Sequence, residues 1–119
     1  MVVHDTSHGR SELTDDETDR LFHALAAATR RDILRRTIEA EQSVSALAAA
    51  YDMSFAAVQK HVAVLEAAHL VVKRAEGRER LVRADPGMIA RARALLSRYE
   101  DLWRSRIDRL DALLADPER

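Results

Sequence analysis

One stretch of the sequence, residues 54–69, combines a helix cap, an apolar face and a small polar face. Ser54 can cap a helix, because its hydroxyl accepts a backbone N–H group that the first turn leaves unpaired. Apolar side chains recur at helical spacing and predict a buried inner face of Val58, Val62 and Leu65. The outer face has small side chains, one amide and one cation, and its members are Phe55, Ala56, Gln59, Lys60 and Ala63. Such a face can lie in a DNA major groove without clashing, although an ordinary amphipathic helix would have the same inner stripe.

Two capping patterns come before this stretch. Thr14 and Thr29 are each followed three residues later by a carboxylate, which is the spacing of a capping box. The two patterns predict a helix over residues 15–27 and a second helix that starts at Thr29 and ends near residue 39. The side chains expected to point inward are Leu21, Phe22 and Leu25 on the first helix and Ile33, Leu34 and Ile38 on the second.

A short helix should immediately precede residues 54–69. A very short strand is a possibility at residues 42–44, and Ser45 then caps a helix over residues 46–51 with Leu47 and Ala50 inward. A three-residue turn leads from there into Ser54. Helix, short turn and capped helix together make a helix-turn-helix, in which the second helix enters the major groove.

A β-hairpin should follow the helix-turn-helix. His69 stands where the chain must turn, and His tolerates the left-handed conformation better than most residues. Residues 70–75 and 80–84 are predicted to form two strands on either side of a Gly-containing turn. The hairpin is a basic wing with Arg78 at its tip and with Lys73, Arg74 and Arg80 on its arms. An Arg at such a tip can reach a neighbouring minor groove.

The last element is a long helix with more apolar surface than a small domain can cover. Asp85 is a good cap and Pro86 suits the first helical position, so the helix should run from there to about residue 115. An exposed apolar stripe of this length indicates a partner surface, and two copies could bury it in a symmetric dimer. A helix that folds back on its own domain is the alternative. The expected dimer contacts are Leu21, Leu95, Tyr99, Leu102, Trp103, Ile107 and Leu110.

The composition points to one small, mostly helical domain. The chain has 119 residues, a net charge of −1 and no cysteine, so a disulfide or a thiolate metal site is excluded. It shows no long apolar run or signal-peptide pattern, and we expect a cytoplasmic protein with no membrane association. Residues 1–28 carry two Arg against six acids, whereas residues 54–83 carry six Lys and Arg against three Glu. Such uneven charge can steer a polyanion to one face, although scattered charge usually means solvated surface.

A second basic cluster lies at the start of the predicted helix that ends near residue 39. Arg30 and Arg31 fall in its first turn, where the helix dipole favours acids instead. Their electrostatic cost is tolerable if the two side chains face DNA phosphates. The alternative is that they pair with neighbouring acids such as Asp32 on the surface.

The sequence resembles the ArsR-type winged helix-turn-helix regulators over residues 19–86. The resemblance lies in residues 21–26 (LFHALA), 29–34 (TRRDIL), 44–48 (VSALA) and 54–71 (SxxAVxKHVxVLxxAHLV). It implies a homodimer that binds operator DNA and usually represses transcription. Carried onto this chain, the resemblance adds Ser54 to the groove-facing set. It places His61 at the edge of the helix, in packing or in contact with phosphate. The residues implied as phosphate or wing contacts are Arg30, Lys73, Arg74, Arg78 and Arg80.

Three departures from the family pattern matter. Phe55-Ala56 replace a frequent Gln-Pro, which suggests a different operator, because Phe cannot pair with adenine but can touch a thymine methyl. Ala27-Ala28 replace the usual Asp-Pro, so the join between the first two helices should be less fixed. Metal-sensing members carry a Cys pair before the turn or Asp and His on the last helix. This chain has no Cys, and residues 86–119 contain no His, which places it with a metal-free branch and predicts no metal or cofactor.

The expected architecture is therefore mainly α with a small β-hairpin: a disordered tail (residues 1–13), a winged helix-turn-helix domain (14–85) and a dimerisation helix (86–119). The expected function is a homodimeric repressor that reads double-stranded DNA, with an unidentified small-molecule effector as one candidate signal. A protein-interaction module without DNA readout is the alternative. An enzyme is not expected, because no nucleophile–base set, metal-ligand cluster or phosphate-binding Gly loop is visible.

Overall fold

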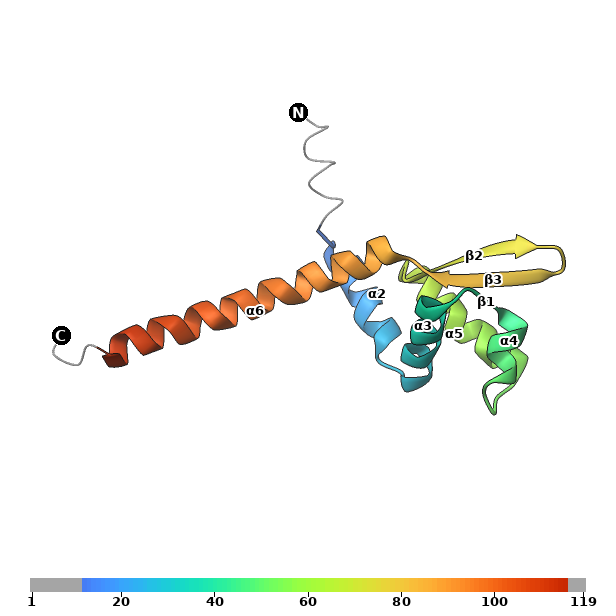
Figure 1. The fold of residues 1–119 in the computed structure, drawn as a ribbon, viewed down its shortest axis with the longest axis horizontal. Coiled ribbons are helices and arrows are strands. Elements are labelled where there is room, and N and C mark those ends of the chain that lie inside the picture. The colour runs from blue at the N-terminus through green and yellow to red at the C-terminus, as the bar shows by residue number, and fades with distance from the viewer. Residues whose placement is uncertain (1–11, 116–119) are drawn as a thin grey trace, which may run out of the picture.

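The computed structural model describes residues 12–115 and shows a winged helix-turn-helix with one long projecting helix (Figure 1). This confirms the predicted fold class. Among the described residues, three helices and a short strand precede the helix over residues 55–67, and a hairpin and a long helix follow it. The elements are α2 (Asp15–Leu25), α3 (Ala28–Glu39), β1 (Gln42–Ser43), α4 (Val44–Ala49), α5 (Phe55–Ala67), β2 (Val71–Glu76), β3 (Glu79–Ala84) and α6 (Pro86–Ala115).

The predicted cap of α2 is confirmed and the predicted caps of α3 and α4 are wrong. Thr14 Oγ1 accepts from Glu17 N at 3.1 Å, and Glu17 Oε1 accepts from Thr14 N at 2.9 Å, which completes a capping box. Helix α3 begins after Ala27 with no side-chain cap, so Thr29 lies inside its first turn. Helix α4 is capped by Ser43 instead of Ser45, because Ser43 Oγ accepts from Ala46 N at 3.0 Å.

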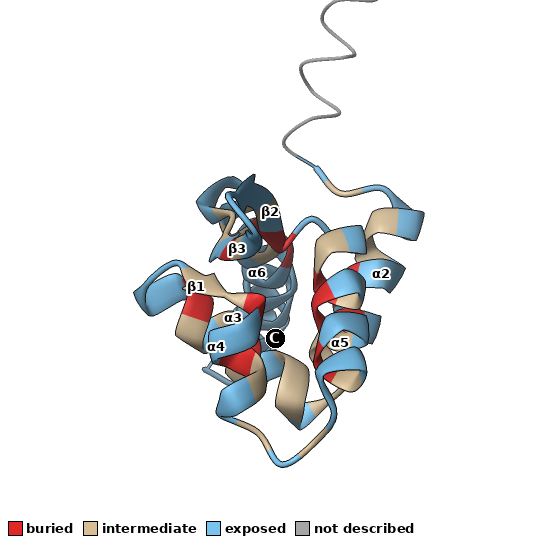
Figure 2. Ribbon diagram, turned by 90° about the vertical axis from the view of Figure 1, so that its right-hand side faces the viewer, coloured by how far each residue is buried: buried red, intermediate tan, exposed pale blue. Residues whose placement is uncertain are grey.

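The hydrophobic core lies between the helices and the base of the sheet (Figure 2). Three side chains expected to point inward, Phe22, Ile38 and Ala50, are exposed. Thr37 is buried beside Ile38 and satisfies its hydroxyl on the carbonyl of Ile33, four residues earlier. The largest fully buried side chains are Leu21, Ile33, Leu47, Val58, Val62, Leu65, Leu70 and Val82.

The helix α5 ends in a Schellman motif around His69, as the sequence predicted for a turn at this residue. His69 has φ 62°, in the left-handed region, and its N–H bonds to the carbonyl of Glu66 at 2.9 Å. The N–H of Leu70 reaches back to the carbonyl of Leu65 at 3.0 Å. These two bonds satisfy the last carbonyls of α5 and direct the chain straight into β2.

The sheet is antiparallel with strand order β1-β3-β2. Glu76 pairs with Glu79, so the turn at the wing tip is only Gly77-Arg78, and Gly77 takes φ 63°. A two-residue hairpin turn needs positive φ at this position, which Gly adopts without a steric penalty. The strand predicted at residues 42–44 is confirmed as β1, which pairs with β3.

The helix α6 is continuous over 30 residues and extends away from the rest of the fold (Figure 1). Asp85 caps its start, since Asp85 Oδ1 accepts from Gly87 N at 2.9 Å. Its first turns pack on the core through Met88 and Leu95, and every residue from Leu96 to Ala115 is exposed.

The prediction of a disordered tail over residues 1–13 falls mostly outside the described residues, which begin at Glu12. Its last two residues contradict it. Leu13 packs against the core, and the carbonyl of Glu12 accepts from Arg91 of α6 at 3.2 Å. Glu12 and Leu13 therefore contact the folded domain.

Candidate nucleic-acid interface

The two faces of α5 lie as the sequence predicted. Ser54 Oγ accepts from Ala57 N at 3.1 Å, which confirms the cap and fixes the first turn. Val58, Val62 and Leu65 are at most 1% exposed and anchor the inner face in the core. The position of the outer face is therefore determined by three buried contacts on the opposite side of the same helix.

The structure brings the predicted groove-facing residues together on the outside of α5. Phe55 is 47% exposed, although it is apolar and stands at the start of the helix. His61 is half-buried at the boundary between the two faces. The other members of the predicted set are all exposed: Ser54, Ala56, Gln59, Lys60 and Ala63.

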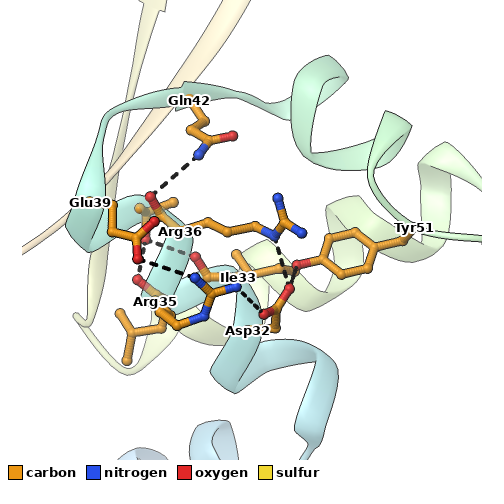
Figure 3. A network of polar contacts seen from close by, with 9 residues as sticks. Asp32, Ile33, Arg35, Arg36, Glu39, Gln42 and Tyr51 are labelled. Carbon is orange, nitrogen blue, oxygen red and sulfur yellow. Dashed lines mark hydrogen bonds and ion pairs between the residues drawn. The ribbon is translucent and has the colours of Figure 1, made fainter.

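A polar network joins α3 to the turn that leads into α5 (Figure 3). Asp32 Oδ2 accepts from the Tyr51 hydroxyl at 2.5 Å and from Arg36 Nε at 2.9 Å. Its other oxygen accepts from Arg35 Nη2 at 2.7 Å. The Arg36 guanidinium carbon also lies 5.4 Å from the centre of the Tyr51 ring, within range of a cation–π contact.

This network stabilises the charged form of Asp32. The hydrogen bond from Tyr51, followed by those from Arg36 and Arg35, holds the pKa of Asp32 well below its ordinary value. Burial of the Tyr51 phenol, together with its bond to Asp32, raises the pKa of Tyr51. Asp32 is thus a carboxylate and Tyr51 a neutral donor at neutral pH.

The role of this network in supporting α5 is not visible in the sequence. Asp32 was expected only as a surface partner for neighbouring arginines, and no role was predicted for Tyr51. The two residues are 19 positions apart, so no local spacing rule connects them. The one available signal was a polar aromatic side chain at the end of a short helix, because a partly buried Tyr hydroxyl needs a partner.

The predicted basic residues of the wing divide into two that contact acidic side chains and two that do not. Arg74 donates two hydrogen bonds of 3.0 Å to Glu41, and Lys73 Nζ lies 3.4 Å from Glu66 Oε1. Arg78, in the turn, and Arg80 are exposed and form no ion pair with residues 12–115. Within that part of the chain, Arg78 and Arg80 are the wing cations of the predicted set that have no acidic partner.

Arg30 and Arg31 have a role that the sequence did not reveal. Arg30 Nε and Nη2 donate to the carbonyls of Ala24 and His23 at 2.9 and 3.0 Å, and Arg31 Nη1 donates to Leu25 at 2.7 Å. The arginines therefore bind the carboxyl-terminal end of α2, where the helix dipole favours cations. These bonds fasten the α2–α3 join, which was expected to be less fixed because of Ala27-Ala28. Acid pairing, one of the two predicted alternatives, is not what these side chains do within residues 12–115, and phosphate contact stays a prediction.

The predicted dimer contacts divide into two groups. Leu21 is 1% exposed and Leu95 is 6% exposed, because both fill the core of a single chain. Their assignment to the dimer interface is therefore wrong. The remaining five lie exposed on the projecting part of α6: Tyr99, Leu102, Trp103, Ile107 and Leu110.

Residues 12–115 contain no group of three or more His, Asp or Glu side chains placed to hold a metal ion. None of the helices between residues 12 and 115 combines the length and the hydrophobicity that a membrane-spanning segment requires.

The arrangement of α3, α4, α5 and the hairpin defines the winged helix-turn-helix class, and comparisons with known proteins specify the family. Residues 25–74 match a family described as a helix-turn-helix domain. HTH-type transcriptional regulator Rv2034 of Mycobacterium tuberculosis is 38% identical over 81 residues, which span 68% of this chain and 76% of that protein. The chain belongs to the ArsR family of winged helix-turn-helix transcriptional regulators.

Solved structures of relatives agree with this assignment. An ArsR-like transcriptional regulator from Rhodococcus sp. RHA1 superposes with a TM-score of 0.73 at 32% identity, over 82% of this chain and 92% of the other. A homodimeric winged helix-turn-helix DNA-binding domain, Mb0332 from Mycobacterium bovis, gives a TM-score of 0.60 at 28% identity, over 75% and 88% of the two chains.

Proposed function

We propose that this protein is a homodimeric repressor that reads a pseudo-palindromic operator with helix α5 and the wing. The observation that carries the proposal is the division of α5 into two faces. Its inner face is buried through Val58, Val62 and Leu65, while Gln59 and Lys60 are exposed on the outer face. A helix held in this way can place its outer side chains against base edges in a major groove.

The outer residues of α5 have chemistry suited to different bases. The Gln59 amide can pair with N6 and N7 of adenine, and the Lys60 ammonium can donate to O6 and N7 of guanine. The exposed Phe55 ring can contact a thymine methyl group. Close approach of the helix is supported by the small side chains of Ser54, Ala56 and Ala63. His61 lies at the edge of this face, near the expected phosphate backbone.

We assign the wing contact to Arg78 and Arg80, because no acid among residues 12–115 competes for these side chains. An exposed Arg at a wing tip suits the negative potential of a narrow minor groove. Lys73 and Arg74 would first have to leave Glu66 and Glu41, so their contribution to DNA affinity should be smaller.

Dimerisation would bury the projecting part of α6. Trp103 is 62% exposed and Leu102 is 67% exposed, and an apolar stripe of this kind favours association in water. The homodimeric state of the Mycobacterium bovis relative supports a similar arrangement. In this proposal residues 14–85 bind DNA, residues 86–119 dimerise, and the two α5 helices lie about 34 Å apart, one turn of DNA.

The test is binding of the full chain to duplex DNA from its own upstream region, with random duplex as the control, at two salt concentrations. We expect one dimer per site, clear preference for the upstream DNA and weaker binding at the higher salt. Transcription from that DNA in vitro should fall when the protein is added. A dimer without DNA affinity at either salt would favour a protein-interaction module instead.

The same proposal places the protein in the cytoplasm and includes a small-molecule effector. Compounds that raise the melting temperature and also release the DNA would identify such an effector.

A further inference from the structure

The guanidinium of Arg30 connects α2 and α3 with helix α5 through a third contact. Two of its nitrogens donate to the carbonyls of His23 and Ala24, as described above. The third, Nη1, lies 3.2 Å from Nδ1 of His61. A single side chain at the start of α3 therefore holds the end of α2 and one imidazole of α5.

The chemistry of this contact determines which nitrogen of His61 carries the proton. An arginine side chain is always protonated and can only donate, so Nδ1 must act as the acceptor. A neutral imidazole that accepts at Nδ1 has its hydrogen on Nε2. The other tautomer would instead direct an N–H group at the guanidinium. The contact with Arg30 thus selects the Nε2–H tautomer of His61.

The remaining nitrogen of His61 is available for a ligand. The imidazole is half-buried beside the exposed Lys60, and its one hydrogen bond to a described residue is the contact with Arg30. An Nε2–H group at the edge of a groove-facing helix is suited to a phosphate oxygen. It would orient the helix on the DNA backbone without adding charge.

We propose that Arg30 is a positioning residue that holds His61 in the Nε2–H form, and that His61 donates this hydrogen to a phosphate of bound DNA. The second half of the proposal rests on the DNA-binding function proposed above. The first half concerns the free protein and is independent of DNA.

The first experiment is NMR of the imidazole nitrogens in the full, DNA-free chain near pH 8, above the ordinary imidazole pKa of about 6.5. We expect His61 to show a protonated Nε2 and an unprotonated Nδ1. In Arg30→Met, which has a similar side-chain length and no donor, the two tautomers should mix. The exposed His69 is the internal control and should not change. A His61 that carries its hydrogen on Nδ1 in the parent protein would overturn the proposal, even if the Arg30 variant does not fold.

The second experiment compares two amide variants of His61 in DNA binding. The amide of Asn reaches the place of Nδ1, whereas that of Gln reaches the place of Nε2. We expect H61Q to bind nearly as well as the parent and H61N to bind about two- to tenfold more weakly, the loss of one neutral hydrogen bond. The salt dependence should be unchanged in both, because no charge is removed.

The outcomes separate this proposal from the function on which it rests. Parent-like affinity in both His61 variants would contradict the phosphate contact, and a smaller salt slope would indicate a charged His61. If the parent itself fails to bind DNA, the proposed function is wrong, while the NMR result still decides the role of Arg30.

Discussion

The hydroxyl of Tyr51 donates to Asp32 Oδ2 across 2.5 Å and so ties the helix-turn-helix turn to helix α3 (Figure 3). Tyr51 stands four residues before Phe55, the first residue of α5. The bond therefore helps to fix where the outer face of α5 begins. Arg36 strengthens the link because it bonds to the same carboxylate oxygen and lies over the Tyr51 ring.

Removing this hydroxyl should destabilise the fold. Tyr51→Phe keeps the ring and its contact with Arg36 but removes one hydrogen bond to a charged acceptor. We expect the free energy of unfolding to fall by about 1.5 to 3 kcal/mol. Urea denaturation at a fixed protein concentration measures this change.

Ser45→Ala is the control for that variant. The Ser45 hydroxyl lies on α4, is exposed and has no hydrogen-bond partner within residues 12–115, so the change in unfolding free energy should stay within about 0.5 kcal/mol. Equal losses in the two variants would show that the bond to Asp32 contributes nothing specific.

The lowered pKa of Asp32 predicts a defined pH dependence of stability. A carboxylate whose pKa is lower in the folded state stabilises the fold above the unfolded pKa of about 3.9, and this contribution is lost as the pH falls toward the folded value. Asp32→Asn removes it. We therefore expect the parent to be more stable than D32N at pH 7, and the difference in unfolding free energy to shrink between about pH 5 and pH 2.

The other carboxylates with lowered pKa values do not affect the comparison between the parent and D32N. The pKa of Glu17 is lowered mainly by the N–H of Thr14, and that of Glu41 mainly by Arg74. Both contributions have the same sign as that of Asp32, and both are present in the parent and in D32N. Stability curves that run parallel from pH 7 to pH 2 would contradict the role assigned to Asp32.

Local rules of sequence were sufficient for the features that depend on neighbouring residues. Thr14 and Ser54 were recognised as caps, and His69 as the residue that turns the chain, because each acts on backbone groups within a few positions. The choice of Ser45 over Ser43 failed for a local reason too. Ser43 and Ser45 are two positions apart and both can cap a helix, so the choice between them depends on the residue at which β1 ends.

Long-range partners could not be read from the sequence. Arg74 is paired with Glu41, 33 residues away, and no spacing rule identifies such a pair. The bond of Arg30 to the Ala24 carbonyl was not predicted, because it depends on the chain turn after α2. Leu21 was predicted to lie at the dimer interface because it belongs to the apolar face of α2. Its burial in the core of a single chain depends on how α2 packs, which no local pattern shows.

The proposed dimer predicts that one charge on α6 will separate the subunits. Trp103→Glu places a carboxylate in the exposed apolar stripe, so the protein should become a monomer at concentrations where the parent is a dimer. Ser105→Glu is the matched control, because two residues turn the helix by about 200° and carry the charge to the opposite side.

Sedimentation velocity distinguishes these outcomes. We expect S105E to remain dimeric and to bind DNA like the parent, and W103E to lose at least tenfold in DNA affinity along with its dimer. A W103E protein that stays dimeric would show that the projecting part of α6 is not the interface.

The wing predicts a difference between two exposed arginines, Arg78 and Arg74. Arg78→Ala should weaken binding to all DNA sequences alike and reduce the salt slope by about one, because one phosphate contact is lost. Arg74→Ala should change the slope far less, since its guanidinium is held by Glu41. Titration of DNA at several salt concentrations tests both, and equal effects of the two variants would remove the distinction between free and paired wing cations.

The most direct test of the account is selection of binding sites from a pool of random duplex DNA by the full-length protein. If paired α5 helices read the DNA, the recovered sequences should share two inverted half-sites whose centres are about 10 base pairs apart. Lys60→Ala should relax the preferred bases without changing that spacing. Recovery of sequences with no common motif, or of single half-sites without symmetry, would contradict a dimer that reads its operator through α5.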